Sequence, residues 1–113
     1  MLNYDKKQNK KTIIAGGEYG EIFWEIDSER TLSIWGDGDI PHVWGELPPW
    51  YPYERGGDAG DPFEIKRIIV KKGVKSIGES AFNGLIHVEE AEIPEGVKKI
   101  GDCAFHECKR LKK

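Results

Sequence analysis

The fold is decided by VKSIGESAFNGLIHVEE at residues 74–90, which aligns without gaps on VKKIGDCAFHECKRLKK at residues 97–113. The two segments lie 23 residues apart and share six identical residues in seventeen positions, where chance would give about one. Self-similarity at a fixed period of about 20–50 residues is typical of repeat proteins, in which each unit buries its apolar side against the next. The sequence therefore predicts stacked repeats.

Each unit is expected to run as strand, glycine turn, short strand, glycine and one-turn helix. The β-branched stretches Ile68 to Val70 and Val88 to Ile93 predict the longer strands. Gly73 and Gly96 suit a turn position with φ > 0. An acidic residue ahead of the Ala-Phe pair in each unit favours a short helix, because negative charge is stabilising near a helix N-terminus.

A single unit cannot bury its own apolar residues. When units stack, equivalent strands become parallel neighbours and equivalent side chains lie over one another. We therefore expect Phe82 to lie over Phe105 in a shared core. The strand at Val88 to Ile93 has no following neighbour. This predicts either a homodimer through the C-terminal repeat edge or fraying of residues 107–113.

The repeated residues carry a family resemblance. SIGESAFNG and KIGDCAFHEC, followed by hydrophobic strand positions and EIPEGV, resemble the BspA-type leucine-rich repeat of surface proteins from gut and oral anaerobic bacteria. Three other segments resemble the β-rich region that often precedes those repeats: EIFWEIDSERTLSIWGDGDIP (21–41), PPWYPY (48–53) and EIKRIIVKKGV (64–74). The resemblance implies an α+β, β-rich solenoid, with an N-terminal β-hairpin cap followed by about two repeats of short strands and one-to-two-turn helices.

The resemblance also bears on cellular location and on the two cysteines. Family members are typically exported, which implies the cell surface or secretion. The N-terminus, however, has too short an apolar stretch for a signal peptide, which favours the cytoplasm if the chain is complete. Cys108 occupies the Cys-like repeat position and Cys103 a variable one. Both are therefore expected to be repeat residues and ordinary thiols rather than metal ligands.

Ahead of the repeats, alternating apolar and polar residues predict a β-hairpin. Its inward-facing residues are Ile22, Trp24 and Ile26, then Leu32 and Ile34, around a polar turn at residues 28–30. Residues 36–62 hold five prolines and six glycines, so an irregular loop is expected there.

The length of 113 residues is that of one domain. We expect a flexible basic arm and then a single domain, in which a β-rich cap with an aromatic loop precedes the repeats. The ranges are 1–12 for the arm, 13–113 for the domain, 13–63 for the cap and 64–113 for the leucine-rich repeats.

Charge is distributed unevenly along the chain, whose formal net charge is −3. Residues 12–63 hold eleven acidic side chains against two arginines. A nucleic-acid binder needs clustered basic residues, and a membrane span needs about 20 consecutive apolar residues. Neither nucleic-acid binding nor membrane insertion is therefore expected. The acidic middle favours a basic protein partner or simple solubility.

An aromatic cluster is the most conspicuous candidate binding site. It consists of Trp35, Trp44, Trp50, Tyr51 and Tyr53. Flat aromatic faces beside carboxylates could bind the sugar rings of a glycan or anchor a protein partner. The same residues could instead plug the open end of the repeats. Their position directly before the first repeat strand favours this structural role, and both interpretations stay open.

The sequence contains no recognised pattern for catalysis, metal binding or cofactor binding. Asp37 and Asp39 have the alternate spacing of calcium loops but lack the later bidentate glutamate. Cys103 and His106 are three residues apart without an orienting third group. We therefore expect no enzymatic activity, no cofactor, and no catalytic or metal-binding residue.

These observations predict a non-enzymatic protein–protein interaction module of leucine-rich repeat type, whose partner the sequence does not name. Two alternatives remain. One is a carbohydrate-binding or cell-surface adhesion module that uses the aromatics of residues 35–53. The other is a small intracellular inhibitor that binds a host protein through an acidic aromatic face.

Overall fold

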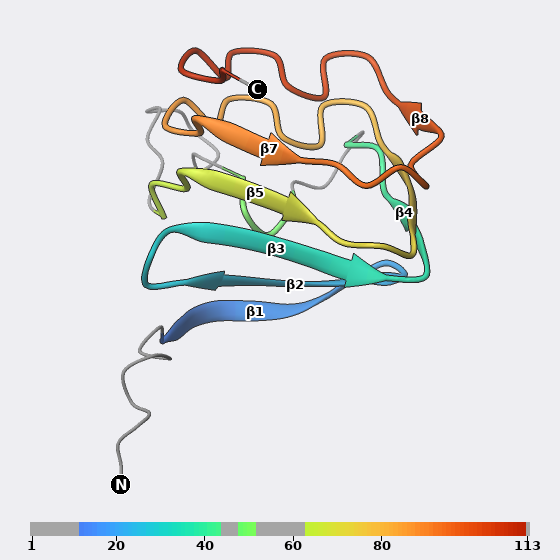
Figure 1. Ribbon diagram of the computed structural model, residues 1–113, viewed down its shortest axis with the longest axis horizontal. Coiled ribbons are helices and arrows are strands. Elements are labelled where there is room, and N and C mark those ends of the chain that lie inside the picture. Colours follow the sequence, from blue (N-terminus) through green and yellow to red (C-terminus); the bar gives the residue numbers. More distant parts are fainter. Residues whose placement is uncertain (1–11, 44–47, 52–62, 113) are drawn as a thin grey trace, which may run out of the picture.

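The computed structural model describes residues 12–43, 48–51 and 63–112, which contain eight strands. The strands are β1 (Ile13–Tyr19), β2 (Ile22–Asp27), β3 (Thr31–Gly36), β4 (Gly38–Ile40), β5 (Arg67–Val70), β6 (Val74–Ile77), β7 (Glu90–Glu92) and β8 (Lys99–Ile100). They form a five-stranded sheet of order β1-β2-β3-β5-β7 and a three-stranded sheet of order β4-β6-β8. Figure 1 shows the strands of each sheet lying one above another.

The predicted hairpin is confirmed. β2 and β3 pair antiparallel, with Trp24 opposite Ile34. The turn is held by the carboxylate of Asp27, which accepts hydrogen bonds from the backbone N–H groups of Glu29 (2.8 Å) and Thr31 (3.2 Å). Aspartate favours turns because its side chain bonds the backbone in this way. These hydrogen bonds offset the cost of burying the Asp27 carboxylate.

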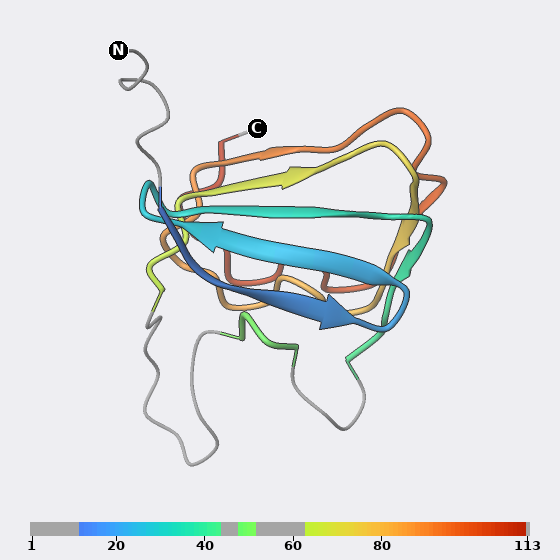
Figure 2. The ribbon, with the colours of Figure 1, turned by 90° about the horizontal axis from the view of Figure 1, so that it is seen from below.

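A further strand, β1, extends the hairpin and was not predicted. It pairs antiparallel with β2, with a register shift between Ile13 and Ala15. Gly16 and Gly17 interrupt any apolar alternation in this stretch, so the sequence pattern does not reveal a strand. Viewed from this end of the molecule, the β1–β2 hairpin lies across the stack (Figure 2).

The stacked repeat is confirmed, and it begins within the predicted cap. β3, β5 and β7 run parallel, which sets Leu32 beside Ile68 and Ile68 beside Ala91. β4, β6 and β8 form a second parallel ladder. The described residues therefore form three levels of two strands each, and the hairpin strand β3 belongs to the first level (Figure 1).

The predicted short helices are wrong. No helix occurs in residues 12–43, 48–51 and 63–112, so this part of the chain also offers no long apolar helix to span a membrane. Residues 79–84 and 102–107 form turns instead. In the first of them, the N–H groups of Ser80, Phe82 and Gly84 donate to carbonyls of the next level at 2.8–3.0 Å, while the intervening N–H groups bond within the turn.

The backbone of these turns also excludes a helix. Ser80 and Cys103, which are 23 residues apart, have φ values of 58° and 61°. Gly84 and Glu107, also 23 residues apart, have φ values of 85° and 64°. Left-handed residues at both positions interrupt a right-handed helix. The repeat therefore conserves the turn geometry even where the amino acids differ.

The positive φ expected at the turn glycine is found in one repeat unit only. Gly73 has a φ of 107°, as predicted for its turn. Gly96 is not among the residues of positive φ, and a Cβ added there would meet no atom within 4 Å, so the prediction for it is wrong. The glycines of the shared Ile-Gly pair are the constrained ones, because a Cβ on Gly101 would lie 2.6 Å from the backbone nitrogen of Glu79.

This contrast predicts a matched pair of substitutions. Gly101→Ala should lower the free energy of unfolding by about 1–3 kcal/mol, since the added methyl group forces two levels apart. Gly96→Ala should leave it unchanged or raise it by about 0.4–1 kcal/mol. Urea unfolding of both variants is the measurement, and equal effects would contradict the close approach of the levels.

The core lies between the two sheets and the turns. Its largest side chains with less than 2% exposure include Trp50, Phe82, Ile22, Ile26, Leu32 and Ile34. Phe82 contacts Phe105, with ring centroids 5.3 Å apart, as predicted. Phe105 is only half-buried, because its level is the outermost one among the described residues.

Candidate functional site

The aromatic candidates do not form one cluster. Trp50 is fully buried, whereas Trp35 and Tyr51 are half-buried. Trp44 and Tyr53 lie outside the described residues. The described aromatics therefore divide between the core and the surface.

Trp50 joins the cap to the repeats. Its indole N–H donates a 2.8 Å hydrogen bond to the carbonyl oxygen of Ala81. Its ring stacks on Phe82 with centroids 5.7 Å apart, and it contacts the edges of Tyr19 and Trp24 at 5.4 and 6.2 Å. These contacts support the structural role for Trp50.

Trp35 belongs to a surface pair. Its ring stacks on Phe23, with centroids 5.9 Å apart and an interplanar angle of 24°. The ammonium nitrogen of Lys71 lies 5.7 Å from the centroid of the Trp35 ring. Phe23 is 41% exposed. We call Phe23, Trp35 and Lys71 the aromatic–lysine cluster.

The cluster lies on one side of the five-stranded sheet, which we call the outer face. Side chains alternate along each strand, so the buried Trp24 and Ile34 face the core while their neighbours face away. The outer face comprises Phe23, Glu25, Thr31, Ser33, Trp35, Arg67, Ile69, Lys71, Glu90 and Glu92. Near its far edge Arg67 and Glu90 form an ion pair of 3.4 Å between Nη2 and Oε2.

Sequence reasoning missed Phe23 and Lys71. Phe23 occupies an outward position in the strand alternation and Trp35 occupies another, so the pattern contains the signal. The contact itself depends on the register of the hairpin, which pairs Phe23 with Trp35. Lys71 reaches the pair because its N–H bonds to the carbonyl oxygen of Ile34 at 2.9 Å.

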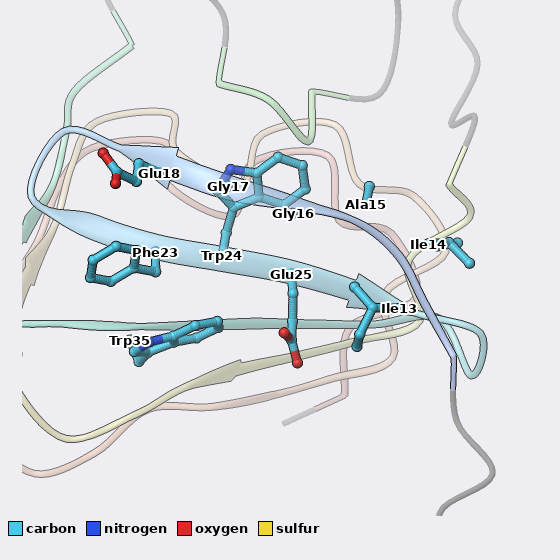
Figure 3. A pocket seen from close by; sticks show the side chains of 10 residues that line it. All are labelled: Ile13, Ile14, Ala15, Gly16, Gly17, Glu18, Phe23, Trp24, Glu25 and Trp35. Carbon is cyan, nitrogen blue, oxygen red and sulfur yellow. The ribbon is translucent and has the colours of Figure 1, made fainter.

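An open groove of about 520 Å³ is lined by residues of β1, of β2 and, at Trp35, of β3. Figure 3 shows Ile13, Glu25, Phe23 and Trp35 on one side of the hairpin ribbon and Trp24 on the other. Gly16 and Gly17 line the groove without side chains. Its lining is otherwise apolar except for the carboxylates of Glu18 and Glu25.

The two aspartates that resemble a calcium loop contact the neighbouring level. Asp39 Oδ1 accepts a 2.8 Å hydrogen bond from the Ser76 hydroxyl. Asp37 lies 3.4 Å from the ammonium nitrogen of Lys75. Among the residues described, no group of three or more His, Cys, Asp or Glu side chains could hold a metal ion.

The cysteines differ in their surroundings. Cys103 is exposed and Cys108 is buried. Burial raises the pKa of the Cys108 thiol to about 11, although a backbone hydrogen bond at Leu85 opposes the shift. The Cys108 thiol also donates to the carbonyl oxygen of Phe82 at 3.2 Å. Cys108 therefore departs from the ordinary thiol that was predicted.

This difference predicts selective modification. At pH 8 a thiol reagent should label Cys103 at least about tenfold faster than Cys108, because the thiolate is the reactive form and a buried thiol seldom ionises. Because the pKa of Cys108 is raised in the folded chain, the buried thiol stays protonated at neutral pH. Its contribution to the free energy of unfolding is therefore complete there and is lost as the pH rises towards about 11. Mass spectrometry of the labelled peptides measures the rates, and equal labelling would contradict the burial of Cys108.

The sequence match falls on the stacked levels. The family model described as BspA type leucine-rich repeat region (6 copies) matches residues 61–113. The chain carries a BspA-type leucine-rich repeat region. In the structure this repeat region supplies β5 to β8, while β3 and β4 form the first level outside the matched residues. No curated protein matches the sequence.

One solved leucine-rich repeat protein shares the fold, and a second has a lower similarity. A leucine-rich repeat protein from Eubacterium ventriosum ATCC 27560 is 22% identical, with a TM-score of 0.69 over 90% of this chain and 25% of its own. A leucine rich cell surface protein from Faecalibacterium prausnitzii A2-165 is 17% identical, with a TM-score of 0.42 over 88% of this chain and 30% of its own. The chain thus spans about a quarter of the length of the first protein. Its fold is β-rich and leucine-rich-repeat-like.

Proposed function

We propose that this chain is a non-enzymatic protein-interaction module that binds its partner with the outer face of the five-stranded sheet. The observation that carries the proposal is the aromatic–lysine cluster, in which a 41% exposed Phe23 stacks on Trp35 beside Lys71. Aromatic side chains dominate the energetic centres of protein interfaces. A leucine-rich repeat region is consistent with this role.

The sheet presents the cluster at low entropic cost. Phe23 and Trp35 lie on directly paired positions of β2 and β3, so the backbone fixes their spacing. Rings of few rotatable bonds on a fixed backbone lose little freedom on binding. The polar side chains around them, including Glu25, Arg67 and Glu92, supply the polar rim that interfaces use for specificity. Recognition therefore needs no chemical step.

The test is selection of protein fragments from a displayed library of the source organism's genome. Fragments that bind the chain should bind the double variant Phe23→Ser, Trp35→Ser at least about tenfold more weakly. The matched control is Ile86→Ser, which removes a 40% exposed apolar side chain from a turn away from the outer face. Equal binding to the double variant and to the unaltered chain would place the binding surface elsewhere.

A carbohydrate ligand is the second candidate. The specific observation that favours it is the 41% exposed ring of Phe23, which lies in the same groove lining as the carboxylate of Glu25. Sugar rings stack on aromatic faces, and carboxylates accept hydrogen bonds from their hydroxyl groups. A glycan array that retains a sugar, with loss of that binding in the double variant, would support this candidate over a protein partner.

A position at the cell surface, with a role in adhesion, also belongs to the proposal. It is supported by the BspA-type repeat region, since the family resemblance implies surface proteins. Antibody labelling of intact cells against lysed cells tests it. Labelling only after lysis would contradict a surface position.

A further inference from the structure

We propose that the β1 edge of the sheet binds an extended peptide segment of alternating basic and apolar residues, which adds to the sheet as a further strand. The inference rests on the proposed function, because it names a partner element for one part of the same module. It concerns the groove along β1, which lies outside the matched repeat region.

The two edges of the sheet differ in how they are protected. Edge strands leave a row of backbone donors and acceptors unpaired, and natural proteins blunt them with short length, charge or proline. β7 (Glu90–Glu92) is such a blunted edge, with three residues of which two are glutamates. β1 (Ile13–Tyr19) is the longest strand described, with seven residues, one charge and no proline. β1 is therefore the edge open to pairing.

The groove lies over β1 and the neighbouring strands, where it gives room to the side chains of a strand added at the β1 edge. Gly16 and Gly17 leave the middle of the edge strand without side chains. Exposed apolar surface flanks this gap, since Ile13 is 50% exposed, Ile14 is 44% exposed and Phe23 is 41% exposed. Backbone bonds to β1 would give affinity, and side chains of the guest strand would enter the groove on alternate positions (Figure 3).

The charge of the groove determines which peptide sequence it favours. The ten lining residues include two carboxylates, Glu18 and Glu25, and no cationic side chain. Glu25 lies in the same row of the sheet as Gly16 on β1, so its carboxylate is one strand away from the edge. Opposite charge attracts the correct strand and suppresses wrong ones. The surface therefore fits an arginine or lysine flanked by apolar residues.

The same charge argues against a second copy of this chain as the occupant. In a β1-to-β1 pairing the added strand itself would bring Glu18, and the adjoining β2 would bring Glu25 and Asp27, whereas the lysines of this end of the chain precede the strand. Like charges brought together at an interface are unfavourable. A basic strand from another protein meets the groove without this penalty.

The probe is a fluorescent nonapeptide in which valine alternates with polar residues. Two of the polar residues are arginine and the others are threonine. The peptide is titrated against the full chain at low salt. It should bind saturably, and its affinity should fall as salt rises. Two peptide controls follow: glutamate in place of both arginines, and N-methylation of alternate backbone nitrogens. Each should weaken binding by about tenfold or more, the second only when the methyl groups face β1.

The protein variants separate this site from the rest of the outer face. Glu25→Lys should weaken peptide binding about tenfold or more. Glu92→Lys makes the same charge change in the same row of the sheet, on the opposite edge strand, and should leave binding within about twofold. Circular dichroism confirms that both variants are folded.

Three results would overturn the inference. They are no binding at millimolar peptide, equal loss in Glu25→Lys and Glu92→Lys, and concentration-dependent self-association of the chain that the peptide does not displace. If the peptide does not bind, but binding of the selected fragments is still weakened by the Phe23→Ser, Trp35→Ser variant, only this inference is overturned. If that variant does not weaken fragment binding either, the proposed function is overturned as well.

Discussion

Phe82→Ala should lower the free energy of unfolding by about 3–5 kcal/mol, among the largest effects expected from a single substitution in this chain. Phe82 has no exposed surface and lies between two other rings, with Trp50 at 5.7 Å and Phe105 at 5.3 Å. Removing the ring leaves a cavity that both neighbours border, in the middle of the stacked levels. Urea unfolding followed by far-ultraviolet circular dichroism measures the loss.

The control for Phe82 is Phe23→Ala. Phe23 is the same amino acid on the outer face, 41% exposed, so its loss leaves no closed cavity and should cost clearly less than the loss of Phe82. If Phe82→Ala cost no more than Phe23→Ala, the shared core of the stacked levels would be contradicted.

Trp50→Ala should destabilise the chain by a similar amount, about 3–5 kcal/mol. The side chain is fully buried, and its indole N–H satisfies the carbonyl oxygen of Ala81. Because the ring also contacts Tyr19 and Trp24 of the cap, its loss should loosen the cap from the repeats. Thermal and urea unfolding of the variant measure the effect.

A second variant isolates the hydrogen bond of Trp50. Trp50→Phe keeps an aromatic ring but leaves the Ala81 carbonyl oxygen without its donor, so it should cost about 1–3 kcal/mol. Trp35→Ala is the comparison, since that ring lies half-buried on the outer face. An unchanged unfolding midpoint in Trp50→Ala, together with lost ligand binding, would assign Trp50 to a binding site instead.

Much of the fold follows from two patterns in the sequence. The 23-residue period aligns Ile68 with Ala91 and Ile77 with Ile100, which are the pairs found in the two parallel ladders. The alternation from Ile22 to Ile34 indicates the hairpin. Both patterns record which side chains are buried, because stacked repeats and half-buried strands each place apolar residues at a regular spacing.

What the sequence could not predict depends on where backbone hydrogen bonds go. The Ala-Phe segments look helical, but the Phe82 N–H bonds to Ala104 in the next level instead of to its own turn. β1 is hidden because Gly16 and Gly17 show no alternation, although pairing with β2 holds them in a strand. These outcomes are set by neighbours in space, which a reading of one segment does not contain.

The candidate site shows the same division. The list of aromatic residues included Trp35 and Trp50, but only their strand and loop positions decide that one is half-exposed and the other buried. Phe23, which completes the surface pair, was counted as an ordinary strand residue. The register of β2 against β3 makes it a neighbour of Trp35.

Site-specific photo-crosslinking tests most directly the claim that the outer face is the binding surface. A benzophenone amino acid is placed singly at positions 23 and 71 on the outer face, and at positions 86 and 100, which are exposed but lie away from it. Each variant is irradiated with the tightest fragment from the library selection. If the outer face binds the partner, crosslinks form from 23 and 71 and none above background from 86 and 100, and the reverse pattern would contradict this assignment.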